Sequence, residues 1–205
     1  MTARAAAGML LLLGTLAAAA PATARSYRNA EYGYAVELPR GLPLCIPDPA
    51  TEHVHGITIW LDDGPAGCHG DETRPYISVS ADHNATEYLD AESVSRWSCD
   101  PSVEEGTPRP TPGGLTIKGA HSVACAVDIT KDWDDGAIVV IVAALGGKVR
   151  DTPGWDPRAP AVVYWIGLHT RPERFDADLA RFRAVLKTVR LFEPGSERSA
   201  TRRRS

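Results

Sequence analysis

The stretch Ala137-Ile138-Val139-Val140-Ile141-Val142-Ala143-Ala144-Leu145 is wholly apolar and decides the predicted fold. A buried helix can also be this apolar, so composition alone leaves two interpretations. The β-branched side chains at residues 138–142 favour a strand, because branching at Cβ suits an extended backbone. A strand that is apolar on both faces lies inside a sheet and is covered on each side. We therefore expect residues 137–145 to form a central strand with helices over both faces.

Segments on either side of this stretch predict an antiparallel sheet. Residues 122–130 and 161–168 have the pattern of strands, and residues 131–136 join the first of them to the central strand as a hairpin. Asp135-Gly136 is a typical hairpin turn signal, because glycine accepts the positive φ that such turns need. Alternating or β-branched patterns predict further strands at residues 34–38, 56–61, 76–80 and 115–118.

Two segments have the apolar spacing of an amphipathic helix. Residues 84–97 predict one helix, which Asn84 or Thr86 would cap. Its apolar stripe comprises Tyr88, Leu89, Ala91, Val94 and Trp97. Residues 174–192 predict a second helix, whose apolar side chains recur at intervals of three and four. This order of strands and helices predicts an α+β domain, namely an α/β/α sandwich with a central antiparallel sheet and a C-terminal helix.

Residues 1–24 have the three parts of a cleavable secretory signal. Arg4 is their only charge, an apolar run follows at residues 5–20, and Ala22 and Ala24 form the small-x-small pattern that precedes cleavage. The alternative is a retained membrane anchor, but about 16 apolar residues fall short of the roughly 20 that span a bilayer. We expect the mature chain to begin at Arg25, to contain no membrane span, and to be periplasmic or secreted.

The charge balance argues against nucleic acid as a partner. The whole chain has a formal net charge of −4, and loss of Arg4 with the signal makes that of the mature chain about −5. A nucleic-acid-binding surface needs a basic patch. The basic cluster Arg202-Arg203-Arg204 lies in residues 193–205, which we predict to be a disordered tail. Residues 25–192 are expected to form a single domain.

The cysteines predict two disulfides. Export would deliver Cys45, Cys68, Cys99 and Cys125 to an oxidising compartment. Four cysteines allow three pairings, and we favour Cys45–Cys68 with Cys99–Cys125. The second pair has structural support, because Cys125 lies on the apolar face of its strand and Cys99 ends the helix expected to cover that face. Zinc sites need closely spaced pairs, which this sequence lacks, and paired cysteines leave no thiolate for catalysis.

The sequence contains no motif that identifies a catalytic centre. It lacks a G-x-S-x-G elbow, and no glycine-rich phosphate loop follows a strand. His53-Val54-His55 is the best candidate for a metal site, because alternate residues of an extended chain point the same way. Asp48, Glu52 or His69 would complete such a site. The simpler interpretation is a polar loop that enters a strand, so we predict no catalytic residue, metal or other cofactor.

The five tryptophans differ in their expected surroundings. Trp60 and Trp165 lie in predicted strands, and Trp97 lies on a predicted helix stripe. Trp133 and Trp155 lie in predicted loops, where exposed aromatic side chains often anchor interfaces. We therefore predict Trp133 and Trp155 as partner-binding residues. The alternative is that each ring folds back onto its own loop.

The two ends of the predicted domain resemble a known family. The opening, Tyr27-Arg28-Asn29-Ala30-Glu31-Tyr32-Gly33-Tyr34-Ala35-Val36-Glu37-Leu38-Pro39, and the closing segment at residues 182–192 resemble exported bacterial proteins with the PsbP-like fold. The resemblance implies an α/β/α sandwich about an antiparallel sheet. Members of that fold include photosystem assembly factors, a GTPase-binding protein, lipoproteins and immunity proteins, so the fold implies no single function. The four cysteines are not general features of the family, and no functional residue carries over.

These observations favour a non-enzymatic binding protein of the bacterial cell envelope, with an inhibitor or immunity protein as the specific hypothesis. The grounds are an acidic, disulfide-linked domain without a catalytic motif, which suits a protein partner. Two alternatives stay open. One is a metal-dependent hydrolase that uses His53 and His55, and the other is a structural or assembly factor of the envelope.

Overall fold

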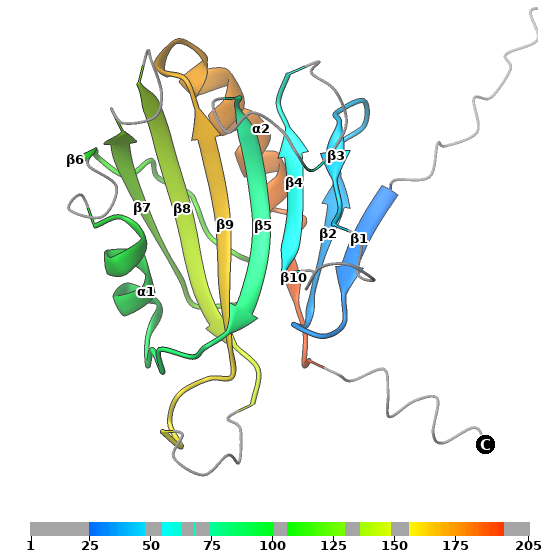
Figure 1. Cartoon of the computed structure of the whole chain (residues 1–205), viewed down its shortest axis with the longest axis vertical. Coiled ribbons are helices and arrows are strands. Elements are labelled where there is room, and N and C mark those ends of the chain that lie inside the picture. The colour runs from blue at the N-terminus through cyan, green and yellow to red at the C-terminus, as the bar shows by residue number, and fades with distance from the viewer. Residues whose placement is uncertain are drawn as a thin grey trace, which may run out of the picture.

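The computed structural model describes residues 25–47, 55–62, 68, 74–100, 106–129, 136–148 and 156–194. These residues form an α+β fold, so the predicted fold class is confirmed. A large antiparallel sheet is the main layer. One helix and a small sheet lie against one of its faces, and a second helix lies against the other (Figure 1).

Seven strands of the described chain make the large sheet, and every neighbouring pair runs antiparallel. Their order in space is β3 (Leu44–Cys45), β4 (Gly56–Trp60), β5 (Tyr76–His83), β9 (Val162–Thr170), β8 (Ala137–Gly146), β7 (Ser122–Ile129) and β6 (Gly106–Pro108). The strands β7, β8 and β9 are neighbours in the order of the chain, as the sequence predicts. The edge strands β3 and β6 are short, which limits pairing with other chains.

Three shorter strands form the small sheet, β1 (Arg25–Asn29), β2 (Tyr34–Leu38) and β10 (Arg190–Leu191). Gly33 lies in the turn between β1 and β2 with a φ of +73°. A Cβ at this position would lie 2.1 Å from the carbonyl oxygen of Phe192. Only glycine permits both this conformation and this approach, and the backbone N–H of Phe192 donates to Gly33 O at 2.8 Å.

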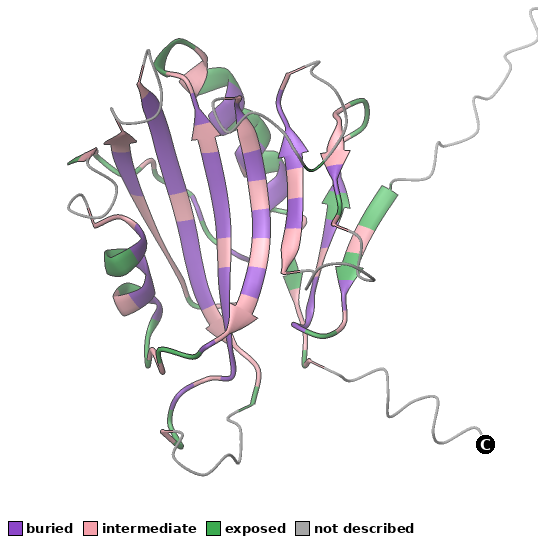
Figure 2. Ribbon diagram, in the orientation of Figure 1, coloured by how far each residue is buried: buried purple, intermediate pink, exposed green. Residues whose placement is uncertain are grey.

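The strand β8 is buried on both faces, as its composition predicts (Figure 2). Val140 and Val142 belong to the main core, whereas Ala143 faces the opposite side of the sheet. Successive side chains of a strand point to opposite faces, so this one strand contributes to both hydrophobic layers. Figure 2 also shows that β5 alternates between buried and intermediate residues, which indicates a sheet face that is only partly covered.

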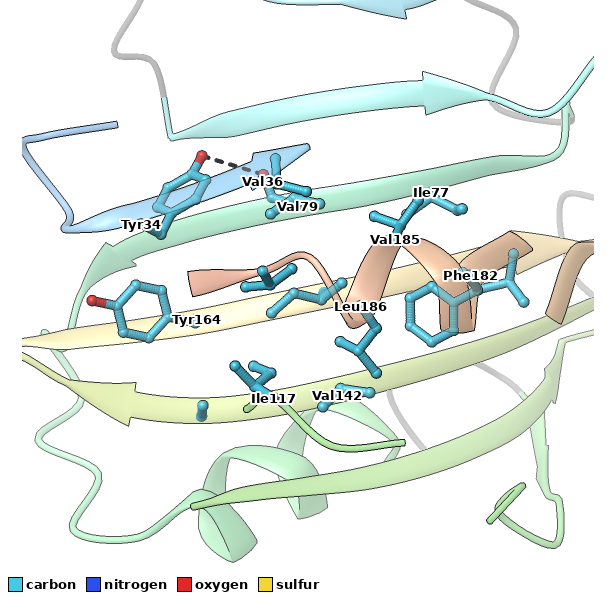
Figure 3. Packing of buried hydrophobic residues seen from close by; sticks show 14 of the residues in the cluster. Tyr34, Val36, Ile77, Val79, Ile117, Val142, Tyr164, Phe182, Val185 and Leu186 are labelled. Carbon is cyan, nitrogen blue, oxygen red and sulfur yellow. Dashed lines mark hydrogen bonds between the residues drawn. The ribbon is translucent and has the colours of Figure 1, made fainter. Parts of the chain in front are cut away.

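The helix α2 (Phe175–Leu186) covers the main-core face and follows a single 3-10 turn, η1 (Pro172–Arg174). Its side chains Phe182, Val185 and Leu186 are buried against the sheet. Figure 3 shows these side chains together with Val36 of β2 and Ile77 and Val79 of β5. The hydroxyl of Tyr34 on β2 donates to the carbonyl of Val79 at 3.3 Å, which links the small sheet to the large one.

The helix α1 (Ala91–Ser98) covers part of the opposite face. Asp90 caps it by accepting a hydrogen bond from the Ser93 backbone N–H at 2.7 Å. Val94 is fully buried and packs with Ala143 of β8 and Val163 of β9. With α2 on one face and α1 on the other, β8 has the helical cover that its sequence predicts.

Both predicted helices are longer than the observed ones. The first begins at Ala91 with Asp90 as its cap, so the prediction of a helix from residue 84, capped by Asn84 or Thr86, was wrong. The side chain of Asn84 instead bonds the backbone N–H and carbonyl of Tyr88, which holds a turn before the helix. The second helix ends at Leu186, after which the chain extends and pairs with β2 as β10.

The sequence also misassigned one strand and missed four. Residues 115–118, predicted as a strand, lie in a loop. Leu115 and Ile117 are nevertheless buried in the main core, which explains their apolar character. The short strands β3, β6 and β10 and the first strand β1 were not predicted. The strands β3, β6 and β10 have two or three residues each, too few to show an alternating pattern.

Candidate functional site

The partly covered face of the large sheet carries two adjoining cavities beside α1. The first has a volume of about 390 Å³ and is lined by Ser78, Trp97, Ser98, Ile141, Trp165, Gly167 and His169. The second has a volume of about 440 Å³ and is lined by Asp82, His83, Asn84, Ala85, Thr86, Tyr88, Trp97, Val163 and Trp165. Because Trp97 and Trp165 line both, we treat the two cavities as one site and call it the Trp97 groove.

Gly167 lines the first cavity, and its lack of a side chain makes room for the hydroxyl of Ser78. It lies in the middle of β9, paired with Ser78 on one side and Ile141 on the other. A Cβ at Gly167 would lie 2.7 Å from Ser78 Oγ and 3.6 Å from His169 Nε2. Glycine inside a strand weakens it and often marks the close approach of a ligand or another chain. The aromatic residues Trp165 and His169 flank Gly167 on the same face of β9.

The helix α1 holds Trp97 over this floor. Trp97 is 56% exposed, although the sequence placed it on the buried stripe of a helix. The helix turns Ala91 and Val94 of the predicted stripe toward the sheet, as expected, so the prediction was wrong for Trp97 and not for the whole stripe. The indole N–H of Trp165 donates to Ser98 Oγ at 3.1 Å, and that hydroxyl donates to Val94 O at 2.9 Å. These bonds fix Trp165 against α1 before any ligand arrives.

His169 closes the far end of the first cavity as a neutral group. Its ring stacks on Tyr76 with ring centroids 4.3 Å apart and an interplanar angle of 12°. Burial lowers the pKa of His169 to about 4, because the ring has lost most of the water that would stabilise its charged form. A neutral imidazole offers one donor and one acceptor. The described residues that line this cavity therefore carry no formal charge at neutral pH.

The second cavity is more polar and is held by a strained connection. Glu87 has a φ of 56°, a conformation that residues other than glycine seldom adopt. Its carboxylate accepts a hydrogen bond from the Asp156 backbone N–H at 3.0 Å. The amide of Asn84 also donates to Pro160 O at 2.9 Å. Both bonds join the segment before α1 to the segment before β9, so this wall is fixed by contacts distant in sequence.

The acidic groups of the site lie at this second end. The side chain of Asp82 is 47% exposed and lies 3.4 Å from His55 Nδ1. Glu87, Asp90 and Glu92 follow Asp82 in the chain, and Arg96 follows them. Hydrogen bonds from Ser93 hold the pKa of Asp90 below its usual range, so this carboxylate stays ionised. The described lining of the Trp97 groove thus carries no Asp, Glu, Lys or Arg at the first cavity and one carboxylate, Asp82, at the second.

Both disulfides expected from the sequence are present, Cys45–Cys68 and Cys99–Cys125. Cys99 follows α1 and Cys125 lies on β7, so the second bond fastens the helix that carries Trp97 to the sheet. Cys45 lines a smaller cavity of about 230 Å³ next to Ser78 and Ser80, on the far side of β5 from α1.

Several predicted site residues lie outside the described part of the chain. They are Trp133 and Trp155, predicted to bind a partner, and His53 with Asp48, Glu52 and His69 of the candidate metal site. His55 is described, and its Nδ1 lies 3.3 Å from the hydroxyl of Tyr32. Within the described ranges, no group of three or more His, Cys, Asp or Glu side chains is placed to hold a metal ion.

The sequence reasoning missed the residues that shape the Trp97 groove. A signal was present in the alternation Trp165-Ile166-Gly167-Leu168-His169, which puts two aromatic rings and a glycine on one face of a strand. The opposing residue Ser78 could not be assigned to that face, because the pairing of β5 with β9 joins segments far apart in the chain.

No protein-family model matches this chain, and no curated protein matches its sequence. Among the described residues, no helix is long and apolar enough to cross a membrane. The two disulfides fit a chain that folds in an oxidising, extracytoplasmic compartment.

Proposed function

We propose that this chain is an exported, non-enzymatic binding protein of the bacterial cell envelope and that the Trp97 groove is its binding surface. The observation that carries the proposal is the exposed Trp97, held above a cavity that Gly167 and Ser78 help to line. Exposed aromatic side chains beside a preformed cavity are typical of binding hot spots. The neutral lining of the first cavity suits recognition better than acid–base catalysis, which needs groups that titrate near the working pH.

The rigid setting of the groove supports binding to a folded partner. The Cys99–Cys125 bond and the indole–hydroxyl bond between Trp165 and Ser98 both fix α1 to the sheet. A surface ordered in advance loses less conformational entropy when it binds. The specific hypothesis is an inhibitor or immunity protein that blocks an envelope toxin or hydrolase. The resemblance of the opening residues 27–39 to the PsbP-like fold, which includes immunity proteins, is a second ground for it.

Trp133 and Trp155 remain predicted contacts with the same partner. They lie in the connections between β7 and β8 and between β8 and β9, and both β8 and β9 contribute residues to the groove. Replacing both with alanine should weaken partner binding without loss of the fold. Unchanged affinity would remove these two residues from the interface and leave the Trp97 groove as the proposed surface.

The test compares two exposed apolar side chains in the same part of the chain. The mature protein is tagged at its C-terminus, produced in its native host and recovered from the envelope fraction as wild type, Trp97→Ala and Leu89→Ala. Leu89 is 46% exposed and does not line either described cavity, so it is the matched control. We expect one stoichiometric partner with wild type and Leu89→Ala, and at least about tenfold weaker binding with Trp97→Ala.

The identity and activity of the partner separate the remaining hypotheses. A toxin or hydrolase whose activity falls in the presence of this chain would establish the inhibitor or immunity role. A large multi-subunit complex would favour the structural or assembly factor instead. Equal recovery of the partner by Trp97→Ala and wild type would reject the groove as the binding surface.

A further inference from the structure

We propose that the Trp97 groove binds an extended segment of a partner protein that carries an aromatic side chain and, four residues away, a basic one. This inference rests on the proposed function and specifies what the partner presents. The aromatic side chain occupies the first cavity over Gly167, and the basic side chain lies beside Asp82.

The first step concerns the shape of the cavity floor. Ser78, Gly167 and Ile141 lie in one row across β5, β9 and β8, with the missing side chain in the middle. Trp165 and His169 lie two residues before and after Gly167, roughly 7 Å away along the strand. The His169 ring leans closer than this spacing, because a Cβ at Gly167 would lie 3.6 Å from His169 Nε2. A flat ring above Gly167 would therefore contact the His169 ring on one side and have the Trp165 ring on the other.

The lining of the first cavity indicates the charge of its occupant. The described residues that line the first cavity include Ser78, Ser98 and neutral His169 as polar groups, but no Asp, Glu, Lys or Arg. A charged group placed here would lose its hydration without gaining an opposite charge. The occupant is therefore uncharged and mainly apolar, with room for one or two hydrogen bonds. The side chain of a tyrosine, tryptophan or phenylalanine meets this description.

The third step concerns the acidic end. Asp82 lies on the same face of β5 as Ser78, four residues further along the strand. It is the only carboxylate among the described residues that line the second cavity, and no Lys or Arg lines that cavity with it. An opposite charge on the partner is favourable here, because complementary potentials guide and orient binding.

The spacing of the two features sets the spacing on the partner. Ser78 and Asp82 are separated by four residues of strand, which corresponds to roughly 13 Å. An extended segment that runs along β5 covers the same distance in four residues. An aromatic residue at one position and a basic residue four positions away would then reach both ends of the groove.

The probe is the capped peptide acetyl-Tyr-Gly-Ser-Gly-Arg-amide, titrated into isotope-labelled protein while amide and indole N–H shifts are followed. Three peptides are controls: one with Ala for Tyr, one with Glu for Arg, and acetyl-Tyr-Arg-Gly-Ser-Gly-amide, which has the same composition but a different spacing. We expect shifts of the Trp165 indole and the Gly167 amide. The Ala peptide should bind at least about tenfold more weakly, and the Glu peptide and the respaced peptide about threefold more weakly.

Variants of the protein assign each effect to its residue. Asp82→Asn should remove the difference in affinity between the Arg and Glu peptides. It should leave the difference in affinity between the Tyr and Ala peptides unchanged. Gly167→Val should abolish binding of both peptides by filling the floor of the cavity. Because Gly167→Val lies in a central strand and could disturb folding, Trp97→Ala at the exposed position serves as the second variant. Leu89→Ala should leave all affinities unchanged.

Each contrary result overturns a stated part of the proposal. Equal binding of the Tyr and Ala peptides, or shifts that avoid Trp165 and Gly167, would overturn the aromatic occupant. Equal binding of the Arg and Glu peptides to wild type would overturn the basic one. A dimer of this chain in solution that Trp97→Ala dissociates would assign the groove to a second copy. The recovery experiment with Trp97→Ala does not depend on the peptides. If Trp97→Ala fails to recover the partner and no peptide binds the wild type, the proposed binding function stands and the proposed aromatic and basic occupant is overturned.

Discussion

The fully buried carboxylate of Asp178 on α2 helps to connect this helix to β9 and to the end of β4. It accepts hydrogen bonds from Thr170 Oγ1 at 2.6 Å and from Arg174 Nε at 3.1 Å, and Arg181 Nη1 lies 3.4 Å from its other oxygen. Both arginines also donate to the carbonyl oxygen of Leu61, just after β4. One buried charge thus orders two cations that fasten α2 to two strands of the large sheet.

Replacing Asp178 with asparagine should lower the free energy of unfolding by about 1–3 kcal/mol. The substitution keeps the shape of the side chain but removes the charge and one acceptor, which leaves Thr170 and the arginines with poorer partners. The arginines remain partly exposed, which limits the loss. Urea unfolding measures the change. Asp176→Asn, at an exposed position of the same helix, should change stability by less than about 0.5 kcal/mol.

His169 should make stability depend on pH in an acidic window. Burial lowers its pKa from 6.5 to about 4 in the folded protein. Between these values the unfolded chain binds more protons, so the free energy of unfolding falls as the pH falls from 6.5 to 4, by at most about 1.4 kcal/mol per pH unit. His169→Gln should flatten this slope in urea unfolding. An unchanged slope in His169→Gln would contradict the prediction.

At the scale of single elements, α1 depends on its attachments. A helix of eight residues is marginal by itself in water. It is held by the Asp90 cap, the packing of Val94, the hydrogen bond from the Trp165 indole to Ser98, and the disulfide between Cys99 and Cys125. Because Trp97 and Ser98 belong to this helix, the geometry of the Trp97 groove depends on the same attachments.

Removing the Cys99–Cys125 bond should therefore loosen α1 before the sheet. The double variant Cys99→Ser/Cys125→Ser should lower the free energy of unfolding by about 2–4 kcal/mol. Amide hydrogen exchange, followed by NMR, should accelerate more in α1 than in β8. Cys45→Ser/Cys68→Ser should also lower stability but leave the exchange of α1 relative to β8 unchanged. Equally slow exchange in α1 and β8 of the first variant would show that the disulfide is not needed to hold the helix.

The elements that could be predicted from sequence are those whose local pattern suffices. The apolar run at residues 137–145 identified β8 and its two covered faces, and the antiparallel pairing of β7 with β8 followed from the hairpin connection between them. The start of α1 could not be predicted, because Asn84 has the chemistry of a helix cap but bonds Pro160 from a distant segment. The pairing of β10 with β2 likewise depends on contacts between the two ends of the chain.

The candidate site was less predictable than the fold. Gly167, Trp165 and His169 were visible as an alternating pattern, but a cavity also requires Ser78 across the sheet and Trp97 above it. These residues come from β9, β5 and α1, and no local signal in the sequence shows that the three elements meet. The sequence favoured Trp133 and Trp155 because they lie between predicted strands, a criterion that cannot detect an exposed ring on a short helix.

At the scale of the whole molecule, the predicted cleavage site coincides with the start of the N-terminal strand. The strand β1 begins at Arg25 and pairs with β2 from Arg25↔Leu38 to Asn29↔Tyr34. Cleavage after Ala24, as the sequence predicts, leaves all of β1 in the mature protein. Cleavage a few residues later would remove part of β1 and expose the edge of β2.

We therefore predict that protein recovered from outside the cytoplasm begins at Arg25 and contains no free thiol. Intact mass spectrometry should give the mass of residues 25–205 less four hydrogens, and alkylation without reductant should add nothing, because all four cysteines are paired. The same chain made without residues 1–24 in a reducing cytoplasm is the control and should be alkylated at its cysteines. An exported form that starts beyond Asn29 would contradict the prediction, because that chain could not form the β1–β2 pair.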